Sequence, residues 1–384
     1  MTKFFVLWIF ISVSPLLSHG QSYWGSATLS GATNEAIDIE SDNLGNSYVA
    51  GYFSGGTSFQ LGTPQVNSQG NSDIYVAKYS PLGTLIWIKT FGGSFSDKPT
   101  DLTLDNLGNI LVTGEYFGLA NFGSTVLNSV NSSKDIFILK LDNSGIVQWA
   151  ISEGAGGSEN AFGITVDGLN NVIVTGQFQG ASNIGGQTLT SMIDPTTNTP
   201  NYDMFISKYS PTGANLWLKT GVAKYAERGL AVAVDATNNI FVTGQFSDTL
   251  NLAGTVINNI DYNVGLVAKL NPSGTLQWLN TLKAGTVVPY DIKINSANEP
   301  VIIGDFTGAM QYSTSSANTA ISAPNTNKIF AVKIANSGAH LWNKTFSSNN
   351  ALSARALSID IAKNVFITGY FECGWTEFQS GPLP

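Results

Sequence analysis

The sequence predicts an all-β fold assembled from repeated four-stranded units, and three observations lead to it. A nine-residue step from an Asp or Asn to a Gly recurs, with successive glycines about 60 to 68 residues apart. Each repeat holds four short segments rich in β-branched and aromatic residues and bounded by turn formers, which is typical of strands. A Trp recurs in the last segment. A fixed step inside a variable period indicates a stacked repeat. The steps and the tryptophans are Asp42/Gly51, Asp105/Gly114, Asp167/Gly176, Asp235/Gly244, Asn295/Gly304 and Asp360/Gly369, and Trp24, Trp87, Trp149, Trp217, Trp278 and Trp342.

The third copy shows the order of the predicted strands. They cover residues 164–166, 172–178, 203–209 and 214–220. Four antiparallel strands per unit, repeated radially, define a β-propeller. Six repeats are visible, so we expect six or seven blades, with the last one incomplete. The repeated Trp is expected to pack between neighbouring sheets.

Two tight turns in each repeat have residues that tolerate positive φ. The opening Asp of the first turn is expected to hydrogen-bond its own backbone downstream rather than to ligate calcium, because the alternating carboxylates of a calcium loop are missing. The positive-φ positions are Gly45, Gly108, Asn170, Asn238, Asn298 and Lys363 in the first turn, and Gly83, Gly145, Gly213, Gly274 and Gly338 in the second.

The segments GGSFSDKPTDLTLDNLGNILVTGEYFG and DIFILKLDNSGIVQW resemble the SBBP-type β-propeller repeat of secreted bacterial proteins. The resemblance extends from Tyr23 to Phe378. It implies a propeller, usually of seven blades, and it brings no catalytic motif. The fifth copy departs from the pattern at residues 295–300, where Asn replaces the opening Asp and Glu-Pro replaces the usual Gly-Asn region. We therefore expect a distorted turn there.

The N-terminus has the pattern of a secretory signal peptide. Lys3 precedes an apolar run from Phe4 to Leu17, and small residues lead up to Gln21. We predict a signal peptide over residues 1–20 and a propeller repeat domain over residues 21–384. The last repeat stops after its second strand, so we expect the natural protein to continue beyond Pro384. The predicted location is extracellular, either secreted or at the outer cell surface.

Composition excludes several classes of partner. The net charge is −8 and the only arginines are Arg228 and Arg355, whereas nucleic acid and anionic membranes require clustered positive charge. No segment after the signal peptide is apolar enough to span a membrane. Cys373 is the only cysteine, so an intramolecular disulfide is excluded and the cysteine is expected to be structural.

The inventory of reactive side chains argues against an enzyme. His340 is the only histidine left after signal cleavage, which excludes a Ser-His-Asp triad and a His-rich zinc site. Asp38, Asp101 and Asp291 occupy the same place in three repeats and are predicted to face the channel. They leave open a carbohydrate-active enzyme, a hydrolase or lyase that uses channel carboxylates. No cofactor is predicted, calcium stays open, and the metal content is unknown.

The long connections all fall on one predicted face, and rigid scaffolds place function on such loops. Tyr202, Tyr225, Glu227 and Arg228 are the candidate binding residues on that face. The sequence thus favours a non-catalytic secreted or cell-surface scaffold that binds an extracellular protein or polysaccharide, with a role such as adhesion. An equally supported interpretation is that these loops vary without having any binding role.

Overall fold

The computed structural model describes residues 34–57, 66–130, 133–257, 261, 263–314, 317–322, 328–348, 351–371 and 376–377. The predicted signal peptide, Trp24 and Cys373 lie outside these residues. The regular elements of the described residues are β-strands, and no α-helix occurs among them. None of them forms a helix with the length and apolar character that a membrane crossing requires.

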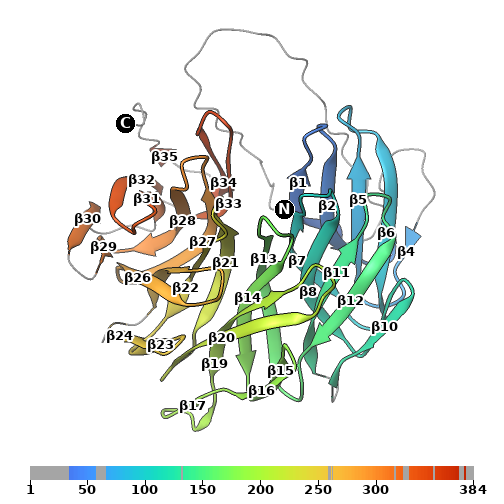
Figure 1. Cartoon of the computed structure of the whole chain (residues 1–384), viewed down its shortest axis with the longest axis horizontal. Coiled ribbons are helices and arrows are strands. Elements are labelled where there is room, and N and C mark those ends of the chain that lie inside the picture. The colour runs from blue at the N-terminus through green and yellow to red at the C-terminus, as the bar shows by residue number, and fades with distance from the viewer. Residues whose placement is uncertain are drawn as a thin grey trace. The chain divides into compact units, whose positions relative to one another are not determined.

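The strands pair as antiparallel four-stranded blades, which confirms the predicted fold class. Within a blade, the order in space is the order in the chain, as Figure 1 shows for the second blade. The first two blades are β1 (Asn34–Ser41), β2 (Ser47–Phe53), β5 (Asp73–Tyr79) and β6 (Leu85–Gly93), then β7 (Lys98–Leu104), β8 (Ile110–Phe117), β11 (Lys134–Leu141) and β12 (Val147–Glu153).

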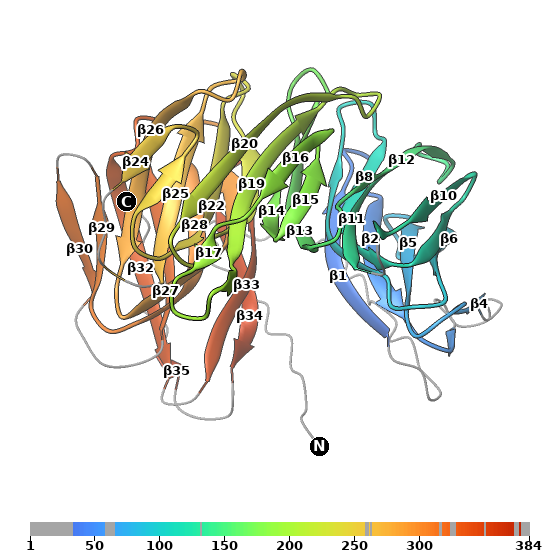
Figure 2. The ribbon, with the colours of Figure 1, turned by 90° about the horizontal axis from the view of Figure 1, so that it is seen from below.

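The later repeats follow the same plan, and Figure 2 shows β22, β25 and β26 of the fourth blade within one sheet. The sixth repeat contributes two described strands, β33 (Leu352–Ile359) and β34 (Val365–Phe371). The third to fifth blades are β13 (Ser158–Val166), β14 (Val172–Gln179), β19 (Tyr202–Tyr209) and β20 (Asn215–Ala223), then β21 (Arg228–Val234), β22 (Ile240–Phe246), β25 (Val264–Leu270) and β26 (Leu276–Lys283), then β27 (Thr286–Ile294), β28 (Pro300–Thr307), β31 (Lys328–Ile334) and β32 (His340–Ser348).

Several connections between second and third strands are short hairpins rather than irregular loops. Three of these hairpins extend the sheet of the preceding blade, because their first strand pairs with that blade's fourth strand. In one case Gly92 pairs with Asn121, and Gly93 pairs with Ala120. Each such hairpin therefore fastens one repeat to the repeat before it. The hairpins are β3–β4 (Gly56–Thr57, Val66–Asn67), β9–β10 (Leu119–Phe122, Thr125–Asn128), β15–β16 (Ala181–Ile184, Gln187–Thr190), β17–β18 (Ile193–Asp194, Thr199–Pro200), β23–β24 (Leu250–Leu252, Thr255–Ile257) and β29–β30 (Met310–Ser313, Asn318–Ser322), and a further short strand, β35 (Thr376–Glu377), pairs with β32.

The chain divides into two compact units. The first holds the described residues of Pro15–Ser191 together with Ile206–Leu218, and the second holds those of Met192–Phe205 and Lys219–Pro384. Each unit has a buried core in which successive blades share apolar side chains. In the first unit Tyr48 and Ile74 pack in one cluster with Phe122 and Phe137, and the second unit repeats this arrangement between its own blades.

The first turn of each repeat is built as predicted. Asp105 Oδ1 accepts hydrogen bonds from the backbone amides of Leu107 and Asn109, each at 2.9 Å. The predicted left-handed positions of both turns have φ between 60° and 87°. These contacts confirm that the opening carboxylate acts on its own turn.

The expectation of a distorted turn at residues 295–300 is wrong. Asn295 Oδ1 accepts hydrogen bonds from the amides of Ala297 at 2.9 Å and Glu299 at 3.0 Å, as an Asp would. In this repeat the negative charge is on Glu299 instead of the opening residue, and its carboxylate forms an ion pair with Lys333 at 2.5 Å. An amide oxygen therefore preserves the turn geometry, and a neighbouring Glu supplies the charge.

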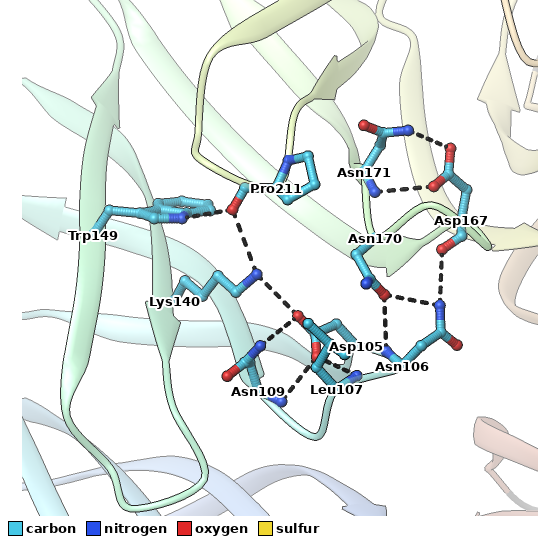
Figure 3. A network of polar contacts seen from close by, with 10 residues as sticks. All are labelled: Asp105, Asn106, Leu107, Asn109, Lys140, Trp149, Asp167, Asn170, Asn171 and Pro211. Atoms are coloured by element: carbon cyan, nitrogen blue, oxygen red, sulfur yellow. Dashed lines mark hydrogen bonds and ion pairs between the residues drawn. The ribbon is translucent and has the colours of Figure 1, made fainter.

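Polar contacts link the first turns to neighbouring strands and repeats (Figure 3). The Lys140 ammonium lies 2.9 Å from the Asp105 carboxylate, and its Nζ also donates to the Pro211 carbonyl of the next repeat at 3.4 Å. Burial alone would raise the pKa of Asp105, but hydrogen bonds from Asn109 and Lys140 hold it below its ordinary value. A link from turn to turn joins the Asn106 side chain to Asp167 and Asn170 of the following repeat.

The repeated Trp packs against the next repeat, as predicted. Trp149 Nε1 donates to the Pro211 carbonyl at 3.0 Å, and Trp87 and Trp278 make the same contact with the following second turn. A Cβ placed on Gly213 would lie 3.3 Å from the Trp149 ring. The glycine therefore provides both the left-handed turn and the room for the indole.

We expect Lys140→Met to lower the free energy of unfolding by about 3 kcal/mol, because it leaves the buried Asp105 carboxylate without its cation. Lys140 is 7% exposed and Asp105 is 0% exposed at their side chains. Urea denaturation at neutral pH measures the change. The matched control is Lys134→Met, whose partner Glu115 is 22% exposed, and it should cost less than about 1 kcal/mol. Equal costs for both variants would contradict the role of the buried pair.

Candidate functional site

The three predicted channel carboxylates bind backbone amides of the following repeat. Asp38 accepts a hydrogen bond from the Leu102 amide at 3.0 Å, and Asp101 accepts one from the Ile164 amide at 2.6 Å. In the second unit Asp291 accepts one from Leu357 at 2.8 Å. All three lie at a break in the register of a first strand. A β-bulge changes the direction in which a side chain points. Here it directs the carboxylate toward a backbone amide in the first strand of the next repeat.

No metal centre emerges from these carboxylates. Within the described part of the chain, no group of three or more His, Cys, Asp or Glu side chains is arranged to hold a metal ion. Asp38 and Asp101 belong to the first unit and Asp291 belongs to the second. The contacts given above join each carboxylate to the next first strand.

The loop candidates differ in accessibility. Arg228 is exposed, and Tyr202 and Tyr225 are half-buried. Glu227 is fully buried, so the expectation of a surface contact through this side chain is wrong. Its amide donates to the Tyr202 carbonyl at 2.7 Å, which draws the residue into the junction between two repeats.

A polar pocket in the first unit was not predicted from the sequence. Its volume is about 540 Å³, within the range of small-molecule sites. It lies between the end of β12, the β15–β16 hairpin and the turn from β19 to β20. Its lining consists of Val130, Ile151, Ser152, Glu153, Gly154, Asn183, Gly185, Gly186, Tyr209, Gly213 and Asn215.

Comparison of the repeats shows that Glu153 is unusual. The strand register places it opposite Ile136, and the same register places Phe91 opposite Ile74 and Leu282 opposite Gly265. Phe91 and Leu282 are buried core residues at 4% and 0% exposure. The second repeat therefore has a carboxylate where the first and fourth repeats have a core hydrophobe, while the third has Gly221 and the fifth has Phe346 at this place.

Two more polar residues in the third blade stand at places that are apolar in most other repeats. Asn215 opens the fourth strand, where other repeats have Leu85, Val147, Leu276 or His340, whereas Tyr209 ends the third strand as Tyr79 does in the first repeat. Ser207, two residues before Tyr209, stands where Ala77 or Leu139 occurs. Three deviations from the prevailing apolar pattern, Glu153, Ser207 and Asn215, thus gather in and behind one pocket.

Hydrogen bonds fix the pocket walls. Gly185 donates its amide to Glu153 Oε2 at 2.7 Å, and Asn215 Nδ2 donates to Ser207 Oγ at 2.8 Å. A Cβ on Gly185 would lie 2.3 Å from Asn215 Nδ2, and its φ is +60°, so both the contact and the conformation favour glycine. The walls are therefore built around the polar side chains.

The carboxyl of Glu153 sits in an electrostatically unusual place. Burial raises its pKa above the ordinary value, while the Gly185 amide and the facing Tyr209 hydroxyl oppose that rise. Burial and the Glu153 carboxylate together raise the pKa of Tyr209 well above its ordinary value. The pocket is thus lined by a carboxyl, amide groups and a phenol whose hydroxyl is buried. Together these groups can both donate and accept hydrogen bonds, as the hydroxyls of a sugar also can.

The missed signal was present in the sequence. Aligning the fourth strands on their tryptophans places Glu153 in a column with Phe91, and Asn215 in a column with Leu85 and Val147. Carboxylates that recur in corresponding places, such as Asp38, Asp101 and Asp291, bind backbone amides of the next repeat and so belong to the scaffold. Residues that break the repeat pattern, such as Glu153 and Asn215, are instead the candidates for a function particular to one repeat.

The blades define the class: this is a β-propeller repeat protein. Residues 86–115 match the family model of the SBBP beta-propeller repeat, so the chain carries this repeat. An uncharacterized WD repeat-containing protein, L264, of Acanthamoeba polyphaga mimivirus is 22% identical over 292 residues. The match covers 67% of this chain and only 18% of that relative's length.

Solved structures with related folds are distant. A protein of unknown function from Bacteroides caccae aligns with 77% of this chain and 93% of its own, at 10% identity and a TM-score of 0.36. The Neurospora crassa Pan2 WD40 domain aligns with 88% of this chain and 89% of its own, at 9% identity and a TM-score of 0.33.

We expect Glu153→Leu to raise the free energy of unfolding by about 1 kcal/mol at neutral pH, because it removes a buried carboxyl and restores a core hydrophobe. The pKa of Glu153 is raised by burial, so the native state keeps the proton longer than the unfolded chain. This carboxyl therefore makes the wild type less stable as the pH rises, and the advantage of the variant should grow from acidic to neutral pH. Urea denaturation at both pH values checks it, and a destabilised variant would contradict it.

Proposed function

We propose that the protein is a non-catalytic propeller scaffold, secreted or held at the outer cell surface, that binds an extracellular polysaccharide through the polar pocket. The observation that carries the proposal is the convergence of Glu153 and Asn215 on one pocket, at places where most other repeats have hydrophobic residues. Burying polar groups costs stability, so a cluster of them needs a reason such as ligand binding.

The chemistry of the pocket favours sugars among extracellular ligands. Sugar hydroxyls donate and accept hydrogen bonds, and the Glu153 carboxyl together with the Asn183 and Asn215 amides match both roles. Glu153 forms no salt bridge with a described lysine or arginine, so its carboxyl is available to a hydroxyl. The net charge of −8 disfavours strongly acidic polysaccharides.

Two further features support the scaffold role. The candidate carboxylates Asp38, Asp101 and Asp291 are engaged with backbone amides, which favours a scaffold role for them over the alternative of a carbohydrate-active enzyme. The apolar leader from Phe4 to Leu17 supports export. The second candidate ligand is an extracellular protein. Its predicted contacts on this chain are Tyr202, Tyr225 and Arg228.

Binding to an array of glycans and extracellular matrix proteins tests the proposal. We expect the wild type to retain neutral glycans, and Asn215→Leu to weaken that binding by at least about tenfold, because a hydrogen-bond partner is replaced by the apolar residue of other repeats. Gln277→Leu is the control, since Gln277 is exposed on β26 outside the pocket. Retention of protein spots alone, or equal glycan binding by both variants, would contradict the proposal.

A further inference from the structure

Buried carboxyl groups meet in pairs at three junctions between successive repeats. In each pair one carboxyl lies at the start of a third strand, and the other lies at or just before the first strand of the next repeat. All six side chains are between 0% and 2% exposed. The pairs are Asp73 with Asp97, Asp135 with Glu159, and Asp203 with Glu227.

The pair in the second unit is in direct contact. Asp203 Oδ2 accepts a hydrogen bond from the Met192 amide at 3.0 Å, and Glu227 Oε2 accepts one from the Ala223 amide at 3.0 Å. The other two oxygens, Asp203 Oδ1 and Glu227 Oε1, are buried and have no further partner. The two carboxyls lie within hydrogen-bonding reach of each other. Two carboxylates in this position would repel, whereas one proton between them makes a hydrogen bond.

Two further pairs lie in the first unit, and their carboxyls accept more hydrogen bonds. A Cβ placed on Gly92 would lie 2.8 Å from Asp97 Oδ2 and 2.9 Å from Asp73 Oδ1, so both carboxyls converge on the glycine. Asp73 Oδ1 has no hydrogen-bond partner, whereas Asp97 accepts hydrogen bonds from the amides of Gly93 and Phe117. At the next junction Glu159 is fully buried; burial and the charge of Asp135 raise its pKa, and the Ser182 hydroxyl opposes that rise.

No described cation compensates these pairs. None of the six carboxyls forms a salt bridge with a lysine or arginine of the described residues. The nearby titratable group on a packed strand is Tyr116, on which Asp97 and Asp135 both act. Arg228 follows Glu227 in sequence, but it is exposed. Backbone amides stabilise the charged carboxylates in part, and a shared proton would remove the repulsion that remains between the two members of a pair.

The chain contains its own comparison at the junction of the fourth and fifth repeats. The Val287 amide donates to the Asn263 carbonyl at 3.0 Å, just as Glu227 donates to Tyr202 at 2.7 Å and Asp97 to Ser72 at 2.8 Å. The backbone link is therefore the same, but the adjoining side chains are Val264 and Val287, both buried. Two buried valines therefore pack at this junction with the same backbone hydrogen bond, so a carboxyl pair is not needed to form the fold.

We propose that the carboxyl pairs at the three junctions each hold a proton between them, so that the repeats pack more tightly as the surroundings become acidic. Protonation of these pairs would affect the packing between repeats, and it is independent of the binding proposed for the polar pocket. It would make the strength of repeat-to-repeat packing respond to extracellular pH.

The pKa shifts agree with this assignment. Burial raises the pKa of Asp97 to about 6 and that of Glu159 to about 7, with a smaller contribution from the neighbouring carboxylate. Burial and Asp203 raise the pKa of Glu227 well above its ordinary value. An unfolded carboxyl loses its proton near about pH 4. The native state therefore binds more protons than the unfolded chain from that pH up to the raised values, and stability falls as the pH rises through this window.

Urea unfolding of the whole chain between about pH 5 and pH 9 tests the proposal. Each proton retained by the native state makes the folding constant fall about tenfold per pH unit. We expect the double variant Asp203→Val with Glu227→Val, which copies the valine junction, to flatten this dependence by up to about tenfold per unit. The reverse graft, Val264→Asp with Val287→Glu, should steepen it. Asp203→Asn with Glu227→Gln, which keeps size and polarity, should flatten it as the valines do.

Two results would overturn the proposal. The first is the same pH dependence in the wild type and in both charge-removing double variants. The second is a stabilisation of the wild type by millimolar calcium at about pH 8 that the valine variant lacks, because a cation rather than a proton would then occupy the pair. Glycan binding at constant pH is a separate readout, so failure here leaves the pocket proposal unaffected.

Discussion

The contact on which the rest of the structure depends is the one between the first turn of a repeat and the strands around it. The opening carboxylate, such as Asp105, closes its own turn through backbone amides and then receives a buried Lys from the third strand. The same Lys and the repeated Trp reach the carbonyl of the next repeat at Pro211. A single short hairpin thus fixes its own geometry and its neighbour's position. Because a repeat contacts mainly its neighbours, such local contacts set the stability of the array.

Much of this arrangement could be predicted from the sequence because it depends on local chemistry. The nine-residue step, the positive-φ residues and the repeated Trp identified the strands, the turns and the packing between sheets. The turn at Asn295 was mispredicted as distorted, since an amide oxygen accepts the same hydrogen bonds as a carboxylate. The hairpins that extend the preceding blades were not predicted, because their short strands depend on a partner in another repeat.

The site was harder to predict, for a physical reason. The polar pocket joins Glu153 of one repeat with Tyr209 and Asn215 of the next, and only the folded structure shows that these residues of different repeats line one pocket. Corresponding acidic residues such as Asp38 and Asp101 attract attention in a sequence, yet they bind neighbouring backbone amides. Glu227 was predicted to be a binding residue on a surface loop, but it is buried next to Asp203. In a repeat protein the regular residues build the scaffold, and the irregular ones are the candidates for function.

The central claim is that these irregular residues form a ligand site. The most direct test is a crystal structure of the protein with a neutral oligosaccharide that the glycan array retains. The account predicts sugar hydroxyls within hydrogen-bond distance of Glu153 and Asn215, with the surrounding blades unchanged. A sugar bound elsewhere on the chain while the pocket holds only water would contradict it.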